Sequence, residues 1–224
     1  MIQPDNIIRS ARKTLSVSID CLGRVTVRAP KNCSQERIFS FLKDKQAWIE
    51  RKVRAAKSVA PPLPDLQNLN GYVFPLLGRD CKIVLYHGER IAFVSEEGKN
   101  SLLYLPQVNT QKRLIKWLKE NALQICSKIT AREAEKMGVG YQSVKISSAK
   151  GKWGSCSYDN RILYSYRLLF APEEIIAYVA VHELSHVRYK NHSAAFWAEV
   201  AKYCPDYKSK RKWLQAHSVF MQIF

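Results

Sequence analysis

The segment from His182 to His186 has residue types and a spacing that suit metal-dependent chemistry. The two histidines are four residues apart, and Glu183 follows the first of them. On an α-helix this spacing places both imidazoles on one face, about one turn apart. Two histidines at this spacing are typical ligands of a hydrolytic zinc ion, and the glutamate between them is typically the general base. The segment therefore predicts a metal-dependent hydrolase in which His182 and His186 bind the metal and Glu183 is catalytic.

A third metal ligand is expected after this segment, because a catalytic zinc ion has three protein ligands and one open position. His192 lies six residues after His186, and on a continuous helix its ring would point about 240° away from the other two. The helix must therefore end first. Asn191 is a suitable residue to end it, and Ser193 is a suitable N-cap for the next helix. Glu199, on that next helix, is the alternative ligand, but only His192 lies at a turn that explains its place.

The residues around the histidines predict a helix buried on nearly every side. Pro172 suits its first position, and Glu173 and Glu174 place negative charge at the positive end of the helix dipole. Apolar residues then occupy the whole circumference of the helix. Polar groups in such a helix need partners, since an unpartnered buried polar atom costs about 1 to 3 kcal/mol. A bound metal ion supplies such a partner.

The first half of the chain predicts two structural segments. Alternating apolar and polar residues around Gly23 predict a β-hairpin over residues 14–29. Ser34 is then expected to cap one helix that runs to about Lys57. Short β-like runs separated by glycines predict an antiparallel meander over residues 71–105.

The second half leads from a long helix into the metal-binding segment. Thr110 is expected to cap this helix, and Gly138 to end it after Met137. Two strands are predicted next, over residues 144–148 and 161–169. The final segment, 219–224, is apolar and fits a last strand, a docking segment or a dimer contact.

The chain is strongly basic. Its 224 residues include 36 Lys and Arg against 19 Asp and Glu, a formal net charge of +17. This surplus favours an anionic partner such as a nucleotide or a nucleic acid, and it is also compatible with a solvated surface that has no specific partner. The sequence has no apolar run of the roughly 20 residues that would span a bilayer, and no secretion-type start, so a cytoplasmic protein with reduced cysteines is expected.

The loop before the second predicted strand is a candidate substrate-binding segment. Lys152, Trp153 and Ser155 lie in it, next to the predicted metal site. A sheet edge at this place would bind an extended peptide as an added strand, whereas the basic residues would suit a phosphate. Arg167 and Tyr189 are weaker candidates for contacting substrate. A tight turn pinned by a buried Trp153 is an equally good interpretation of this loop.

Several motifs in the last third of the chain resemble the YgjP-like family of metallopeptidase-type proteins, which is related to the SprT-like and WLM zincins. The motifs follow one another over about 65 residues. They are Lys152-Trp153-Gly154-Ser155-Cys156-Ser157, Arg167-Leu168 before Ala171-Pro172, His182-Glu183-Leu184-Ser185-His186, Asn191-His192-Ser193 with Phe196-Trp197, and Cys204-Pro205-Asp206-Tyr207 leading to Arg211-Lys212-Trp213-Leu214. The resemblance implies zinc on His182, His186 and His192, with Glu183 as base. The metzincins share the histidine spacing, but Tyr189 replaces their glycine and no Met-turn follows.

The predicted fold class is α+β. We expect a zincin-like metallohydrolase core with an antiparallel sheet and a buried active-site helix, preceded by a β-rich N-terminal part. Pro61 to Pro64 is the best boundary. The expected parts are 1–60, a β-hairpin and helix; 61–109, the meander; and 110–224, the catalytic part, unless all three form one integrated domain.

Three functions are consistent with the sequence. The first is a zinc-dependent, peptidase-like hydrolase, although manganese, iron or nickel would also suit the imidazoles. The second is a nucleoside triphosphate pyrophosphohydrolase that uses the same site, an activity also ascribed to the YgjP-like family. The third is a non-enzymatic nucleic-acid-binding protein, suggested by the charge and by Trp48, Trp117 and Trp213 among basic residues.

Overall fold

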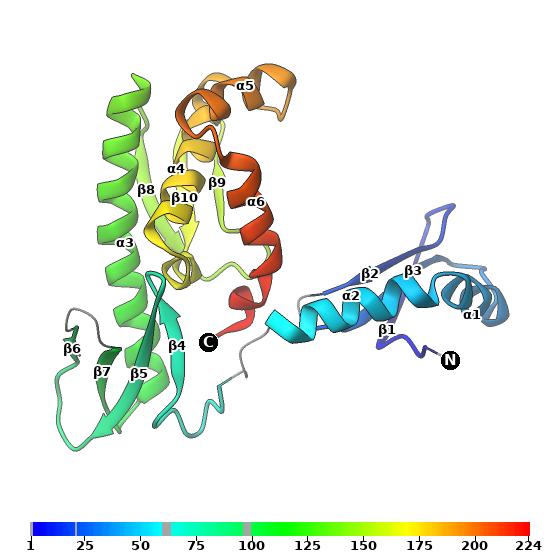
Figure 1. Ribbon diagram of the computed structural model, residues 1–224, viewed down its shortest axis with the longest axis horizontal. Helices are drawn as coiled ribbons and strands as arrows, with labels where there is room; N and C mark the ends of the chain where they lie inside the picture. Colours follow the sequence, from blue (N-terminus) through cyan, green and yellow to red (C-terminus); the bar gives the residue numbers. More distant parts are fainter. Residues whose placement is uncertain (1, 21, 60–63, 96–99) are drawn as a thin grey trace. The chain divides into compact units, whose positions relative to one another are not determined.

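The computed structural model describes residues 2–20, 22–59, 64–95 and 100–224 (Figure 1). The chain divides into two compact units, one of Met1–Pro62 with Gln215–Val219 and one of Leu63–Leu214 with Phe220–Phe224. Helices and three small mixed sheets occur along the chain, so the predicted α+β class is confirmed. Of the boundary predicted at 61–64, only Pro64 lies within the described residues.

The first unit contains a three-stranded sheet of β1 (Asn6–Ser10), β2 (Ser16–Ile19) and β3 (Val25–Pro30) in the order β1-β3-β2. The strands β2 and β3 pair antiparallel, as the predicted hairpin requires, and Gly23 has a φ of 79° in the turn between them. The strand β1 pairs parallel to β3 and was not predicted. Its residues are mostly exposed, which explains the weak apolar pattern there.

Two helices, not one, follow this sheet. They are α1 (Gln35–Asp44) and α2 (Gln46–Val59). Ser34 caps α1 as predicted, because its side chain accepts a hydrogen bond from the backbone N–H of Arg37. The prediction of one continuous helix was wrong: Lys45 has a φ of −105° and a ψ of 9°, which ends α1. The apolar periodicity continues across this break, from Leu42 to Ile49, so the pattern did not reveal it.

The second unit begins with a four-stranded sheet of β4 (Val73–Leu76), β5 (Arg79–Tyr86), β6 (Ala92–Val94) and β7 (Ser101–Pro106). The order is β4-β5-β7-β6, and β5 pairs parallel to β7. The prediction of an antiparallel meander was therefore wrong in its central pair. The strand β7 carries the more deeply buried residues and occupies the centre, whereas the exposed β6 lies at the edge.

The long helix α3 (Thr110–Met137) follows. Gly138 ends it in the left-handed conformation, with a φ of 59°, as predicted. The predicted N-cap was one residue too late. Asn109 occupies the N-cap position, while the Thr110 hydroxyl donates to the carbonyl of Pro106.

A third sheet precedes the segment of the predicted metal ligands and contains β8 (Ser143–Ser147), β9 (Gly154–Cys156) and β10 (Arg161–Ser165) in the order β8-β10-β9. The strand β10 pairs parallel to β8 and antiparallel to β9, so this sheet is mixed and not wholly antiparallel. The predicted strand 161–169 is strand only to Ser165. The 3-10 helix η1 (Tyr166–Phe170) replaces its second half, because a short buried apolar run does not distinguish strand from helix.

The chain ends with helices α4 (Glu173–Arg188), α5 (Ala194–Tyr203) and α6 (Tyr207–Ala216) and the 3-10 helix η2 (Ser218–Gln222). The helix α4 lies beside α3 and the third sheet (Figure 1). Among the described helices, none combines the length and apolarity needed to cross a lipid bilayer. The final residue, Phe224, packs edge-to-face against Phe74 and Phe170. Residues Phe220–Phe224 of the apolar tail belong to the second unit and are mostly buried, whereas Val219 belongs to the first unit.

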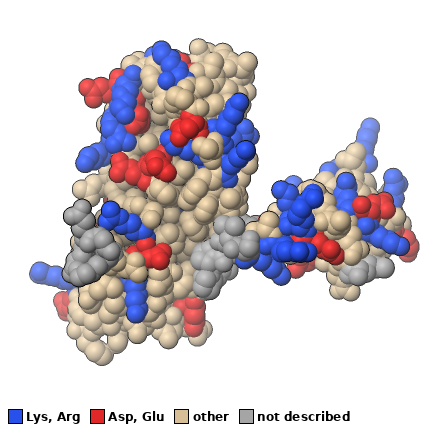
Figure 2. All heavy atoms as spheres, viewed as in Figure 1, with Lys and Arg blue, Asp and Glu red and all other residues tan. Residues whose placement is uncertain are grey.

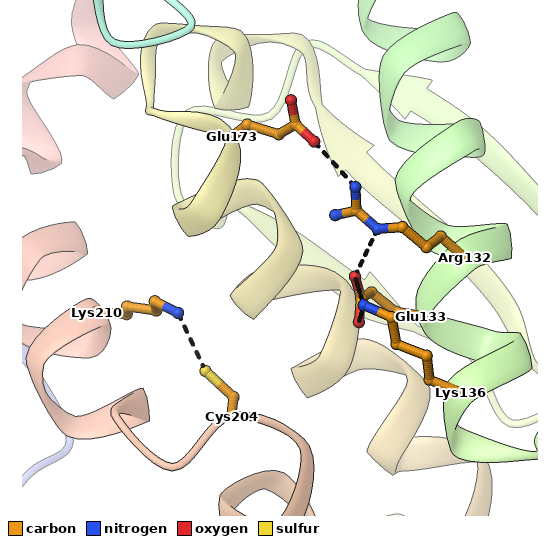
Figure 3. Close-up of polar contacts among 6 residues, drawn as sticks. All are labelled: Arg132, Glu133, Lys136, Glu173, Cys204 and Lys210. Carbon is orange, nitrogen blue, oxygen red and sulfur yellow. Dashed lines mark hydrogen bonds and ion pairs between the residues drawn. The ribbon is translucent and has the colours of Figure 1, made fainter.

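An ionic network joins α3 to the start of α4 (Figure 3). The Arg132 guanidinium donates to Glu133 at 2.8 Å and to Glu173 at 3.1 Å. Lys136 also donates to Glu133, and only 5% of the Glu133 surface is exposed. Because a buried carboxylate needs partners, these cations compensate its charge, and Arg132 fixes the first turn of α4 against α3.

Candidate active site

The helix α4 presents the predicted functional residues in its last two turns. Pro172 is its N-cap, one residue before the position predicted for it. The helix ends at Arg188, and Tyr189 is the C-cap with an extended backbone. The predicted stop at Asn191 was therefore two residues too late. The Asn191 side chain instead accepts a hydrogen bond from the backbone N–H of Ser193, which tightens the turn.

Three imidazoles converge next to this turn. The ligand atoms of His182, His186 and His192 all lie within 4.8 Å of one another. His192 comes from the loop between α4 and α5, and its Nε2 lies 3.1 Å from Nε2 of His182. Ser193 caps α5 as predicted, since its hydroxyl accepts from the backbone N–H of Phe196. The early end of α4 and this cap turn the chain so that His192 points back at the other two rings.

The two histidines of α4 are in an environment that keeps their rings neutral. The Nδ1 of His186 lies 2.9 Å from the carbonyl oxygen of Tyr189, an arrangement that places its proton on Nδ1 and leaves Nε2 free for a metal. Burial lowers the pKa of His186, and it lowers the pKa of His182 to about 3, with the neighbouring His186 and His192 adding to the effect. Both rings are therefore neutral at physiological pH, as metal binding requires.

Aromatic side chains orient the exposed His192. Its ring stacks on Trp197 with centroids 5.7 Å apart and an interplanar angle of 27°. Trp197 stacks on Tyr207 at 5.2 Å and 20°, and the Arg211 guanidinium lies 5.0 Å from the Trp197 ring centroid. Phe196, fully buried, contacts the same imidazole. These contacts restrict the rotamer of a ligand whose backbone lies in a loop.

Glu183 lies buried beside the imidazoles, with 5% of its surface exposed. Burial raises the pKa of its carboxyl to about 8, against opposing effects of Lys152 and the backbone of Cys156. Gly154 lies so close that an added Cβ would be 2.7 Å from Oε1 of Glu183. A carboxyl with a raised pKa and a fixed position suits a group that takes up and releases a proton near neutral pH.

Glu199, the alternative third ligand, lies in a different environment. Its carboxylate forms an ion pair with Arg188, the last residue of α4. The same guanidinium donates to the carbonyls of Met137 and Gly138 at the end of α3. Glu199 therefore helps to join three helices, and among the described residues the cluster suited to a metal consists of the three histidines.

A cavity of about 300 Å³ opens onto the histidines and Glu183. Its other lining residues are Gly154, Ser155, Cys156 and Lys190. Of the residues predicted to bind substrate, Ser155 thus lies at the cavity. Lys152 is exposed and does not line the cavity, but its positive charge lowers the pKa of Glu183. Tyr189 does not line the cavity; its backbone carbonyl instead contacts the His186 ring.

Two predicted residues have structural contacts. Trp153 packs against the hydrophobic core of the second unit, and its carbonyl accepts from the N–H of Ser165. Arg167 is 2% exposed and donates to the carbonyls of Ser148, Ile223 and Phe224. Its guanidinium thus holds the C-terminal tail against the third sheet.

Sequence reasoning missed Lys190, Cys156 and Gly154 as residues of this cavity. Lys190 donates to Oδ1 of Asn160 at 2.6 Å and to the carbonyl of Ser157 at 3.3 Å. It thereby links the loop after α4 to the turn between β9 and β10. Its position two residues before His192 was the available signal. A glycine within the Lys152–Ser157 motif indicated that the backbone at Gly154 is closely approached by another group. Nothing in the motif indicated that this group is the Glu183 side chain.

These residues fit a transition-metal ion. Three nearby imidazoles, two of them held neutral by burial, form a typical ligand set for zinc and leave a position open towards the cavity. The Nε2 atoms of His182 and His192, 3.1 Å apart, need a proton or a cation between them, because two facing lone pairs would repel. A buried carboxyl beside such an ion is the arrangement of a hydrolytic centre.

The fold and this centre define the chain as a metallopeptidase-type protein. The family model of the YgjP-like metallopeptidase domain matches residues 13–217, so the chain belongs to the YgjP-like family. A comparison with curated protein sequences found no match.

Two solved structures are similar to parts of the chain. The metallopeptidase zymogen jannalysin of Methanocaldococcus jannaschii is 21% identical, over 39% of this chain and 94% of that one, with a TM-score of 0.35. The metallopeptidase zymogen abylysin of Pyrococcus abyssi is 23% identical, over 42% and 87%, with a TM-score of 0.34.

Proposed function

We propose that this protein is a zinc-dependent peptidase with His182, His186 and His192 as metal ligands and Glu183 as general base. The observation that carries the proposal is the convergence of three imidazoles and one buried carboxyl on a single cavity. Membership of the YgjP-like family supports metal-dependent peptidase chemistry.

Each residue has a distinct part in the proposed reaction. A zinc ion held by the three imidazoles would lower the pKa of water and polarise the scissile carbonyl. Glu183 accepts a proton from the attacking water and delivers it to the leaving amine. In the metal-free protein burial raises the pKa of this carboxyl to about 8, and a divalent cation beside it would lower that pKa again, so that the carboxylate could act as the base.

The free edge of β9 is the proposed binding site for the substrate backbone. Ser157 and Trp153 exchange backbone hydrogen bonds with β10, so the register turns the N–H and C=O groups of Gly154 and Cys156 to the other side. Gly154 and Cys156 line the cavity, and the backbone of Cys156 also forms a hydrogen bond with the Glu183 carboxyl. An extended peptide that pairs with this edge would place a backbone carbonyl beside Glu183. This arrangement favours a peptide over a nucleotide.

Hydrolysis assays on the purified protein test the proposal. Zinc-loaded protein is incubated with a denatured, unstructured protein substrate, with and without a chelator, alongside Glu183→Gln. We expect cleavage that the chelator abolishes, that added zinc restores, and that Glu183→Gln lowers by at least about a hundredfold.

The same proteins are incubated with nucleoside triphosphates. Chelator-sensitive release of pyrophosphate that Glu183→Gln abolishes, without proteolysis by the native protein, would overturn the peptidase assignment. Proteolysis that persists in Glu183→Gln would instead overturn the assigned role of Glu183.

A further inference from the structure

The first unit carries a disproportionate share of the positive charge. Residues 1–62 include thirteen Lys and Arg against five Asp and Glu. This surplus of eight is nearly half of the net charge, in little more than a quarter of the chain. Figure 2 shows that Lys and Arg outnumber Asp and Glu on the visible face of this unit. A dense positive surface of this kind attracts polyanions.

Trp48 lies on the helix α2, among the basic residues of the first unit. It is 38% exposed, unlike Trp117 and Trp213, which are half-buried. Lys45, Arg51 and Lys52 are at positions −3, +3 and +4 relative to it, and all three are exposed. Arg51 and Lys52 share α2 with Trp48, and residues at these separations are neighbours on a helix surface, with Cβ atoms about 5–6 Å apart. Lys45 lies just before α2, where its carbonyl accepts from the N–H of Ile49. Three cations therefore lie within four residues of one exposed indole; we call these four residues the Trp48 surface.

The indole and its neighbouring cations are available for an external ligand. Within the described ranges, no aromatic ring or cation covers Trp48; Lys45 lies over the ring of Phe41 instead, 5.5 Å from its centroid. Arg51 and Lys52 have no ion-pair partner within those ranges. An exposed tryptophan is hydrophobic surface that folding leaves in water. The position of Trp48 beside Arg51 and Lys52 suits a ligand that has both a flat apolar group and a negative charge.

We infer that the Trp48 surface binds single-stranded nucleic acid, with a base stacked on the indole and phosphates on Lys45, Arg51 and Lys52. Bases offer an aromatic face to any exposed ring, and the backbone supplies negative charges close to each base. A membrane surface would require several apolar side chains on one helix face. Among the α2 side chains that the structure describes, Trp48 is the one large apolar group that is exposed, with small alanines at 47 and 55.

The acidic residues nearby do not cancel this charge. Asp44 is four residues before Trp48 and exposed, and Glu50 lies on another side of α2, where it accepts a hydrogen bond from the side chain of Gln46. The ion pair between Asp20 and Arg24 is local to the hairpin turn. The Trp48 surface thus keeps three cations against one neighbouring carboxylate, so we expect binding that depends strongly on salt.

Fluorescence anisotropy of the full-length protein with a labelled 20-nucleotide single-stranded oligonucleotide tests this inference. Trp48→Ala should weaken binding at least about fivefold, and Trp48→Phe should retain most of it. Arg51→Glu with Lys52→Glu should also reduce the slope of log affinity against log salt by about 1.4, the value for two lost phosphate contacts. His182→Ala should leave binding unchanged, which separates this result from the fate of the proposed peptidase.

A charge-matched control is available on α3, where Lys112 and Lys128 are exposed. Lys112→Glu with Lys128→Glu changes the net charge equally and should weaken binding much less than the pair on α2. Equal losses for both pairs, or no loss for Trp48→Ala, would contradict the inference. Binding to anionic lipid vesicles but not to the oligonucleotide would contradict it as well.

Discussion

Gly154 and Glu183 are in such close contact that a Cβ atom at residue 154 would lie 2.7 Å from Oε1 and 3.1 Å from Cγ of the carboxyl side chain. The distance is shorter than any ordinary Cβ contact. The glycine is needed here because β9 passes directly over the buried Glu183 side chain. Backbone conformation does not require it, since Gly154 lies outside the set of glycines with positive φ.

Gly154→Ala is predicted to displace the Glu183 carboxyl and to lower the rate of hydrolysis about 10- to 100-fold, because small displacements of a catalytic group are costly. Rate measurements on metal-loaded protein check this. Gly151→Ala is the control, since a Cβ there meets no atom within 4 Å. Adding Gly154→Ala to Glu183→Gln should lower the remaining rate little further; an equal loss in both backgrounds would show that the glycine does not act through Glu183.

Glu183→Gln is predicted to stabilise the metal-free protein increasingly as the pH rises. Burial raises the folded-state pKa of Glu183 to about 8 from an ordinary value of 4.5. The unfolded chain therefore loses this proton first, and the native protein loses stability between about pH 4.5 and pH 8, whereas glutamine does not titrate. Melting temperatures in chelator across this range measure the effect.

The low pKa of His182 destabilises both proteins alike below about pH 6.5, so it cancels from the comparison. A constant gap between the two melting curves from pH 5 to pH 8.5 would be inconsistent with a buried, protonated Glu183.

Trp197→Ala is predicted to weaken metal binding about tenfold, because the indole holds His192 towards the other two ligands. Competition with a chromogenic chelator measures the affinity. Trp197→Phe should recover part of the loss. Trp48→Ala, which removes an indole from the first unit, is the control and should leave the affinity unchanged. An unaltered affinity in Trp197→Ala would show that the loop alone fixes His192.

Arg167→Met is predicted to lower the free energy of unfolding by about 2 kcal/mol, because it leaves the buried backbone oxygen of Ile223 without its side-chain donor and removes one of the two donors of Phe224. Denaturant titration measures the change. Arg161→Met is the matched control: Arg161 is exposed and pairs with Asp159, and such surface pairs contribute about 0–1 kcal/mol. A normal unfolding midpoint with impaired substrate affinity would instead favour the role in substrate binding first considered for Arg167.

The sequence indicated the helix α4 with His182 and His186, and the return of His192 from the loop after it, because these signals are local. Helical spacing aligned His182 with His186, and the need to end the helix before His192 followed from the same geometry. The capping side chain of Ser193 acts within three residues. Local rules of this kind do not depend on the rest of the fold, so the site was predictable from one segment.

Contacts between distant segments were not predictable in this way. The parallel pairing of β5 with β7 depends on which strand buries more surface, and the strand lengths did not reveal it. From the sequence alone, Arg167 was a candidate anion-binding residue. In the structure it donates to Ile223 and Phe224, which lie more than fifty residues away in the sequence. The requirement for glycine at residue 154 likewise comes from a distant residue, because the Glu183 side chain on α4 leaves no room for a Cβ atom.

Elemental analysis of the protein purified without added chelator shows directly whether the three histidines hold a metal ion. We expect about one zinc ion per chain, and the loss of that metal in His186→Ala and in His192→Ala. Two results would contradict it: native protein that holds no transition metal even after incubation with excess zinc, or variants that retain the full content.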